Sequence, residues 1–365
     1  MRPVSYWDYL RLEELLALQG GVERDEKALS NDEVLFVTVH QIYELWFKLI
    51  LREMRAARNL FMADSVAEQE LSGAVRSLER AATIFRVAIA HWDVMETLPP
   101  REFLAFRDKL LPASGFQSAQ LRQVEILLGL DDSERAHAGL EEGWKKALRG
   151  ADAAKSPALA RVETELADRP TLREAIDEWL YRTPIDGCDP HRQDAGERLA
   201  EFLAAFLAAH AQETDATAER AVSIARSPAD AQAIRARYEA EKVSVEAFFA
   251  PSEAEGGARR ARIRAAMLFI ETYRELPLLA WPREVLDGLV GLEELFVIFR
   301  QRHARMVERV IGRRTGTGGS SGVDYLDATA KYRIFRDLWA IRTLQIRRAA
   351  APALRHPEFY DFRSG

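Results

Sequence analysis

Apolar residues recur at steps of three and four along almost the whole chain, and this periodicity limits the possible folds more than any other feature. From Asp32 to Leu60 the steps are 4, 3, 4, 3 and 4, and after Pro282 the same alternation continues for about seven helical turns. The first series is Phe36, His40, Tyr43, Phe47, Ile50 and Met54. The second is Val285, Leu289, Leu292, Phe296, Phe299, His303, Met306 and Val310. Since no alternating strand pattern bounded by turns occurs, the sequence predicts an all-α helical bundle.

Proline and glycine residues mark the limits of the other predicted helices. The pair at 99–100 opens a helix through about Lys109, the segment 112–115 breaks it, and an amphipathic run follows at 117–128. The candidate caps of the two long helices are Ser30 or Asn31 at the start of the first and Gly312 at the end of the second.

The middle of the chain, about 132–257, is rich in Ala, Glu and Arg and is predicted to be a helical insertion or scaffold. Its predicted breaks lie near Gly150, near Pro170, at 184–190 and at 251–257. A Gly/Ser/Thr cluster at 315–322 separates the second long helix from a helical stretch at 323–339.

Composition excludes several classes of protein. The chain has 365 residues, 48% of them hydrophobic, which is enough for a sizeable core in one to three domains. Its charges are mixed and the net charge is −6, so a basic nucleic-acid surface is not expected. Cys188 is the only cysteine, which excludes an internal disulfide framework, cysteine-rich metal sites and covalent haem attachment through a CxxCH motif.

The N-terminal segment does not resemble a signal peptide, because charged residues interrupt it throughout. The longest apolar stretch considered as a membrane span, 202–209, is too short to cross a bilayer. We therefore expect a cytoplasmic protein that contacts neither a membrane nor a nucleic acid.

Two of the seven histidines, His40 and His303, lie on the apolar faces of the two long helices. Each is either a core histidine with hydrogen-bonded ring nitrogens, or an iron ligand or acid–base group in a pocket. Position alone does not separate the two interpretations. If iron is bound through haem, the haem must be held non-covalently.

Three other motifs are candidates for a binding or catalytic role. Arg107 follows Phe103 by one helical turn and is either a surface residue or a clamp for a carboxylate. The Gly-rich cluster is a linker or a ligand-contacting loop, and it lacks the lysine of a phosphate-binding Walker motif. No nucleophile elbow surrounds Ser114, Ser320 or Ser321, so a serine hydrolase is not expected.

Several sequence blocks, in order and at compatible spacings, resemble those of the tryptophan 2,3-dioxygenase family. The blocks are YWDYLRL at 6–12, FVTVHQIYELWFK at 36–48, ETL at 96–98, FLAFR at 103–107, PASGFQS at 112–118, RH at 302–303 and GTGGSSG at 316–322. The middle of the chain matches only loosely, for example WLYRTP at 179–184. The resemblance implies an enzyme that inserts both atoms of O2 across the indole C2–C3 bond of L-tryptophan and releases N-formyl-L-kynurenine, the first step of the kynurenine pathway.

The resemblance also implies a haem b in each subunit, ferrous when active, and a role for each matched residue. His303 becomes the axial iron ligand, and His40 the distal histidine that accepts a hydrogen bond from the indole N–H. Arg107 holds the substrate carboxylate, and Thr317 contacts the ammonium and carboxylate ends. The indole pocket is then lined by Phe36, Phe103 and Leu110, with Ser114 beside haem and substrate.

In this family the N-terminal segment reaches the site of a neighbouring subunit, which assigns that role to Tyr6, Tyr9 and Leu10. The resemblance therefore implies a homotetramer built as a dimer of dimers, and residues 1–365 are expected to form a single domain because the site residues come from both ends of the chain. Phe299 stands where many relatives carry tryptophan, so a substituted tryptophan remains a possible substrate. A related haem monooxygenase and a non-catalytic haem sensor remain the alternative functions.

Overall fold

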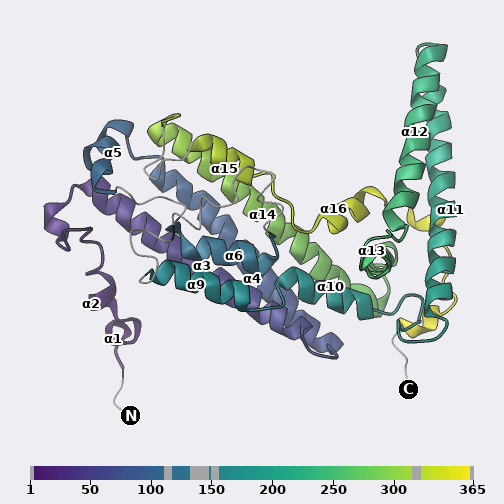
Figure 1. Ribbon diagram of the computed structural model, residues 1–365, viewed down its shortest axis with the longest axis horizontal. Coiled ribbons are helices and arrows are strands. Elements are labelled where there is room, and N and C mark those ends of the chain that lie inside the picture. The colour runs from purple at the N-terminus through teal and green to yellow at the C-terminus, as the bar shows by residue number, and fades with distance from the viewer. Residues whose placement is uncertain (1–3, 111–116, 132–147, 149–155, 315–321, 362–365) are drawn as a thin grey trace. The chain divides into compact units, whose positions relative to one another are not determined.

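The computed structural model of the protein describes residues 4–110, 117–131, 148, 156–314 and 322–361. These residues are largely helical and contain no strand, only an isolated bridge between Ile185 and Cys188 (Figure 1). The all-α prediction is therefore confirmed. The chain forms two compact units, which are described one at a time: unit 1 comprises 1–55, 79–171 and 291–334, and unit 2 comprises 56–78, 172–290 and 335–365.

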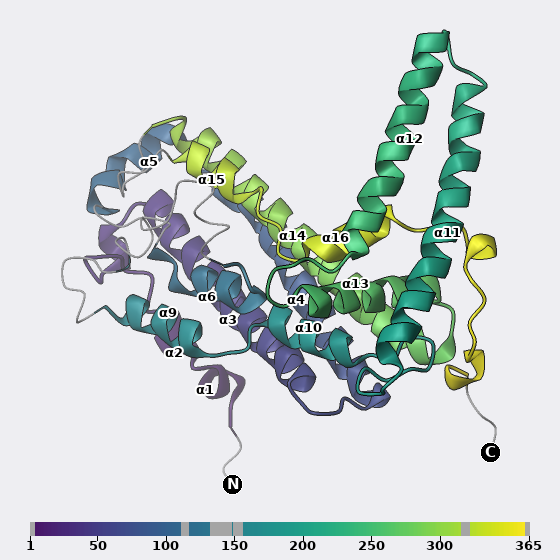
Figure 2. The ribbon, with the colours of Figure 1, turned by 45° about the vertical axis from the view of Figure 1, so that its right-hand side comes forward.

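Three long helices, α3 (Asn31–Phe61), α4 (Glu68–Met95) and α14 (Ala280–Ile311), supply residues to both units. The other elements of unit 1 are α1 (Tyr6–Leu10), α2 (Leu12–Leu15), η1 (Glu26–Ala28), α5 (Pro100–Phe106), η2 (Arg107–Leu110), α6 (Ala119–Leu128), α9 (Pro157–Ala167) and α15 (Val323–Thr329). Helices α6 and α9 lie side by side (Figure 2) and bury Ala119, Ile126 and Val162 in a common cluster with Leu148.

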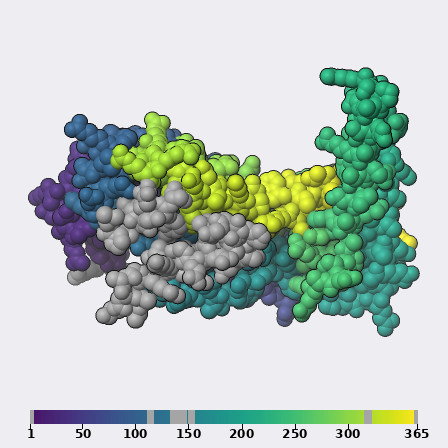
Figure 3. All heavy atoms as spheres, turned by 45° about the horizontal axis from the view of Figure 1, so that its top comes forward, coloured from purple at the N-terminus to yellow at the C-terminus, as the bar shows by residue number. Residues whose placement is uncertain are grey.

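Unit 2 contains a helical hairpin made of α11 (Ala195–Val222) and α12 (Pro228–Phe249), whose far end forms a narrow projection in Figure 3. Lys242 of α12 pairs with Asp215 of α11 at 2.8 Å. The other elements are α10 (Leu172–Arg182), α13 (Gly257–Thr272), η5 (Pro277–Leu279), α16 (Arg336–Thr343), η6 (Arg348–Ala350) and η7 (Pro357–Phe359). The breaks predicted near Pro170, at 184–190 and at 251–257 coincide with the ends of helices, whereas Gly150 lies outside the described residues.

The two long predicted helices are found as α3 and α14, and their caps follow the sequence. The Ser30 hydroxyl accepts a hydrogen bond from the Glu33 N–H at 3.1 Å, so Ser30 is the N-cap of α3. Gly312 has a φ of 64°, the left-handed conformation that commonly ends a helix. The helix predicted from Pro100 to Lys109 changes after Phe106 into the 3₁₀ turn η2.

The prediction of one helical stretch at 323–339 was wrong, because α15 ends at Thr329 and α16 begins at Arg336. In the segment between α15 and α16, buried side chains of α14 form hydrogen bonds with backbone groups. The Arg300 guanidinium donates to the Thr329 carbonyl at 2.6 Å, and the Glu293 carboxylate accepts from the Ile334 N–H. Because side chains satisfy the Thr329 carbonyl and the Ile334 N–H, the chain can depart from helical geometry here without burying unpaired backbone groups.

Helix α3 is long and apolar enough, by length and composition, to cross a bilayer. The core helix of a globular protein passes the same test, and α3 buries Tyr43, Phe47, Ile50 and Met54 inside the protein. These four side chains pack in the core, although contacts within the chain bury only 28% of the apolar window of α3.

Candidate active site

The apolar stripes of α3 and α14 are buried except near their histidines. On α14 every member of the predicted series is buried apart from His303, which keeps partial exposure. On α3 the series is buried from Tyr43 onward, whereas Phe36 is half-buried and His40 retains accessible surface. Both histidines thus interrupt a buried face, and unit 1 holds both of them.

The His40 imidazole is held in one tautomer by its own helix. Its Nδ1 lies 2.7 Å from the Phe36 carbonyl oxygen, one turn earlier on α3. Because a carbonyl only accepts, Nδ1 carries the proton and donates it, which leaves Nε2 with a lone pair. His40 therefore presents a hydrogen-bond acceptor on the side of the ring that faces away from the helix backbone.

The pKa of His40 is lowered, chiefly because the surrounding protein removes hydration from the charged form. The residue nevertheless has accessible surface, so it does not lie in a filled core. An accessible neutral imidazole suits a hydrogen bond to a donor such as an indole N–H.

Aromatic rings lie around Phe36, next to His40. The Phe36 ring centroid lies 4.1 Å from that of His40, 5.8 Å from that of Phe103 and 5.6 Å from that of Phe106. Phe103 and Phe106 are buried on α5, which begins at Pro100 with its helix-compatible backbone. The structure thus brings Phe36, His40 and Phe103 together as the sequence predicted, in an environment suited to an apolar ring.

His303 lies on α14 with its ring stacked on Trp92 of α4. The two ring centroids are 4.7 Å apart and the planes are parallel to within 4°. Burial lowers the pKa of His303 to about 4, with smaller contributions from the nearby His40 imidazole and Arg300 guanidinium. Among the described residues no hydrogen bond engages either nitrogen of this ring, so His303 is a neutral base with an available lone pair.

An aromatic cluster fixes the surroundings of His303. Trp92 lies 4.3 Å from Tyr43 and 5.4 Å from Phe299 between ring centroids, and the Tyr43 hydroxyl donates to the Ala88 carbonyl at 3.0 Å. Burial raises the pKa of Tyr43, so its hydroxyl stays protonated. This packing leaves His303 little rotational freedom.

The remaining predicted site residues are distributed as follows. Arg107 is half-buried at the end of α5, and Leu110 is half-buried at the end of η2. Ser114 and Thr317 lie outside the described residues. Tyr6 and Tyr9 expose 75% and 78% of their surface and Leu10 exposes 43%, so contacts within the chain cover little of the two tyrosines and about half of the leucine.

Sequence reasoning missed His91 and Trp92, both on α4. His91 stacks on Tyr43 with 5.0 Å between centroids, and burial lowers its pKa. The only available signal was an adjacent His–Trp pair in an apolar helical segment, and that signal is ambiguous without knowledge of which helix packs against α14.

Fold and site together define an all-α protein whose three long helices gather neutral histidines and aromatic rings in one unit. Comparison with known proteins gives the family. The sequence profile of the tryptophan 2,3-dioxygenase family matches residues 1–345. The chain therefore belongs to the tryptophan 2,3-dioxygenase family, which confirms the resemblance drawn from the sequence blocks.

Similar proteins come from distant organisms. Tryptophan 2,3-dioxygenase from Sorangium cellulosum is 53% identical over 368 residues, which cover 99% of this chain and 88% of the relative. Tryptophan 2,3-dioxygenase 2 from Ralstonia nicotianae is 49% identical over 368 residues, covering 99% and 98%. Tryptophan 2,3-dioxygenase from Anopheles gambiae is 31% identical over 354 residues, covering 96% and 87%.

Proposed function

We propose that this protein cleaves the indole C2–C3 bond of L-tryptophan with O2 to give N-formyl-L-kynurenine, the first step of the kynurenine pathway. The observation that carries the proposal is the pair of neutral histidines, His40 and His303, which keep accessible surface on two largely buried apolar stripes in one unit. Membership of the tryptophan 2,3-dioxygenase family at high coverage supports the same reaction.

The donor set around His303 fits a haem b in each subunit. Among the described residues no group of three or more His, Cys, Asp or Glu side chains could hold a metal ion. A single neutral imidazole holds iron well when a porphyrin supplies the other ligands, and His303 offers such an imidazole. Haem, when bound and ferrous, supplies the oxygen activation that no amino-acid side chain provides.

The chain's own residues then bind and orient the substrate. Phe36, Phe103 and Leu110 are proposed to contact the indole ring, and His40 Nε2 to accept the indole N–H, since its Nδ1 is engaged by Phe36. Arg107 is proposed to hold the carboxylate, because a guanidinium matches a carboxylate with two parallel hydrogen bonds. We assign His40 to positioning of the substrate rather than to proton abstraction.

Other parts of the proposal concern segments outside this constellation. Ser114 is assigned a place beside haem and substrate, and Thr317 contacts with the amino-acid end. Tyr6, Tyr9 and Leu10 are proposed to complete the site of a neighbouring subunit, since their exposed apolar surface is otherwise unexplained. The assembly is then a homotetramer of cytoplasmic subunits, a dimer of dimers in which residues 1–365 act as one domain and 132–257 as a helical insertion.

Isotope labelling tests the reaction. Purified protein is loaded with haem, reduced without oxygen, mixed with L-tryptophan and exposed to ¹⁸O2, and the product is identified by mass spectrometry. We expect N-formyl-L-kynurenine that carries two labelled atoms. A single label in an intact indole ring would identify a monooxygenase instead, and haem binding without any product would identify a sensor. Substituted tryptophans tested in parallel establish the preferred substrate.

A further inference from the structure

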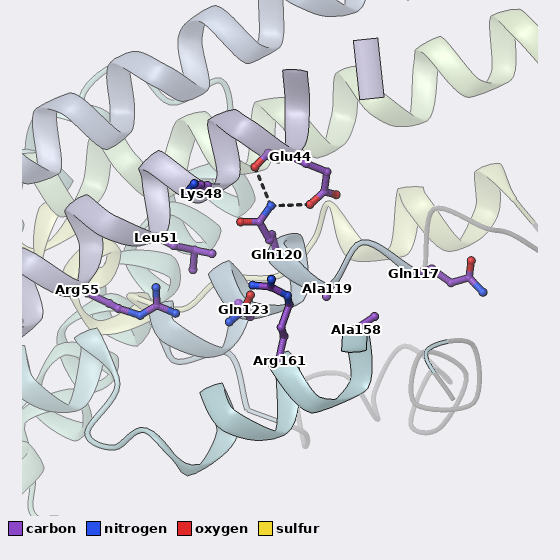
Figure 4. A pocket seen from close by; sticks show the side chains of 10 residues that line it. All are labelled: Glu44, Lys48, Leu51, Arg55, Gln117, Ala119, Gln120, Gln123, Ala158 and Arg161. Atoms are coloured by element: carbon purple, nitrogen blue, oxygen red, sulfur yellow. Dashed lines mark hydrogen bonds between the residues drawn. The ribbon is translucent and has the colours of Figure 1, made fainter. Parts of the chain in front are cut away.

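A cavity of about 580 Å³ lies in unit 1 between α3, α6 and α9 (Figure 4). Its walls share no residue with the predicted substrate and haem site, although Glu44 follows His40 by one turn on α3. The lining is mainly polar and contains three cations, Lys48 and Arg55 from α3 and Arg161 from α9. Neither the reaction nor the aromatic cluster accounts for these side chains.

One wall of the cavity is fixed by hydrogen bonds between α6 and α3. The Gln120 amide donates to both the backbone carbonyl and the carboxylate of Glu44, at 2.7 and 2.8 Å. Ser118, the N-cap of α6, donates to the other Glu44 carboxylate oxygen at 2.6 Å. Because Glu44 accepts from both partners, its carboxylate is engaged by the wall of the cavity.

Beside the cavity, a buried carboxylate of α9 links this helix to α3 and α6. Glu165 accepts hydrogen bonds from Arg55 and, at 2.9 Å, from Gln123. Its other carboxylate oxygen is buried and has no hydrogen-bond partner in the described part of the chain. The charge of Arg55 is therefore neutralised by Glu165. Figure 4 shows Arg55 and Arg161 both extending toward Gln123.

Lys48 and Arg161 remain as cations at the cavity. Both are exposed, and within the described residues neither forms an ion pair. When Glu44 and Glu165 are counted against Lys48, Arg55 and Arg161, one positive charge is left over. Two unpaired cations beside preformed, hydrogen-bonded walls favour a negatively charged ligand.

We propose that this cavity binds a small polar anion, a carboxylate or a phosphate, through Lys48 and Arg161. The apolar side chains of the lining are Leu51, Ala119 and Ala158, and the lining includes no aromatic ring. A second indole is therefore a poor occupant, since an indole needs extended apolar walls. The Gln120 and Gln123 amides donate to carboxylates, which leaves their carbonyl oxygens to accept from hydroxyl groups of the ligand.

Calorimetry on the haem-loaded, full-length protein tests the proposal with sodium phosphate and sodium succinate as probes at constant ionic strength. We expect saturable binding of at least one probe to one site per chain. Lys48→Gln and Arg161→Gln should each weaken it about three- to tenfold, and the double substitution should abolish it. Comparison of the two probes separates a phosphate site from a carboxylate site.

Arg52→Gln is the matched control, because Arg52 is an exposed cation on α3 outside the cavity lining. This variant should bind the probes as the unmodified protein does. No saturable binding of either probe, or equal weakening in Arg52→Gln, would overturn the proposal. The measurement uses neither tryptophan nor oxygen, so its outcome is independent of the proposed reaction.

Discussion

Arg300 and His303 are neighbouring polar residues on α14, and they differ in whether the surrounding protein forms hydrogen bonds with them. Arg300 is buried and donates to the Thr329 carbonyl and to Glu125, and its guanidinium lies over the Phe296 ring at 4.2 Å. His303, less than one turn later, makes no hydrogen bond to the described residues and stacks on Trp92. The fold therefore pairs the buried charge of Arg300, whereas the neutral imidazole of His303 has no hydrogen-bond partner among the described residues.

The paired region forms a closed network in the core of unit 1. Glu125 accepts from Arg122 at 2.6 Å and from Arg300, and Arg122 also donates to the Tyr325 hydroxyl at 2.7 Å. A buried charge costs several kcal/mol unless it is compensated, so each member depends on the others. This network contrasts with the surroundings of His303, where neither the imidazole nor the buried Nε1 of Trp92 has a hydrogen-bond partner among the described residues.

Removing the Glu125 charge from its network with Arg122 and Arg300 should have the largest effect on stability. Glu125→Gln leaves two buried guanidinium groups without their carboxylate, and we expect a loss of about 3–5 kcal/mol in the free energy of unfolding. Denaturant unfolding measures this loss. Glu308→Gln is the control, because Glu308 forms a pair with Arg305 at the same i,i+3 spacing on the surface of α14. Equal effects of the two substitutions would refute the contrast between buried and exposed pairs.

Removing the proposed carboxylate clamp should affect substrate binding more than folding. Arg107→Ala is expected to weaken L-tryptophan binding by about 2–5 kcal/mol, by analogy with other desolvated ion pairs. Steady-state kinetics should show this as a raised KM, with haem content unchanged. An unaltered KM would show that Arg107 does not contact the carboxylate.

Removing the proposed acceptor of the indole N–H should have a smaller effect. His40→Ala loses one hydrogen bond, worth about 0.5–1.5 kcal/mol, so turnover should fall by about tenfold at most. Haem absorbance, measured on the same sample, should remain because His40 is not the proposed iron ligand. Turnover equal to that of the unmodified protein would contradict the role of the His40 Nε2 atom.

Asp177 of unit 2 provides the smallest effect and a test of what a half-buried carboxylate costs when burial outweighs the nearby arginines. Burial raises its pKa to about 6, above the ordinary value of 3.8. The folded state therefore binds the proton more tightly than the unfolded state, and this group's contribution to stability falls as pH rises from about 4 to about 6.

Asp177→Asn should therefore raise the unfolding free energy at pH 7.5 by an amount on the order of 1 kcal/mol, since partial exposure reduces the penalty. The difference should shrink as the pH is lowered toward 4.5. Thermal unfolding across this range, with Glu253→Gln as an exposed control, measures it. A gain that does not depend on pH would show that the carboxylate charge is not its cause.

Much of the fold was predictable from the sequence because long apolar periodicities and proline or glycine breaks act locally. The limits of α3 and α14 and the caps Ser30 and Gly312 belong to this class. The interruption after Thr329 was not predictable, because it depends on α14 side chains that lie far away in sequence.

Some features of the candidate site were likewise predictable from the sequence, and others were not. The pairing of Phe36 with His40 follows from one helical turn, and the family blocks identified His303. The contact of Trp92 with His303 required the packing of α4 against α14, which no local pattern encodes. The tautomer of His40 likewise depends on a hydrogen bond that only coordinates reveal.

The central claim is that the available imidazole of His303 binds haem iron, and haem titration of His303→Ala tests it most directly. We expect this variant to lose stoichiometric haem binding and the haem absorbance spectrum, whereas His91→Ala, which changes another histidine beside the same aromatic cluster, should keep both. Added imidazole should restore the spectrum of His303→Gly. Haem content and spectra of His303→Ala equal to those of the unmodified protein would contradict the claim.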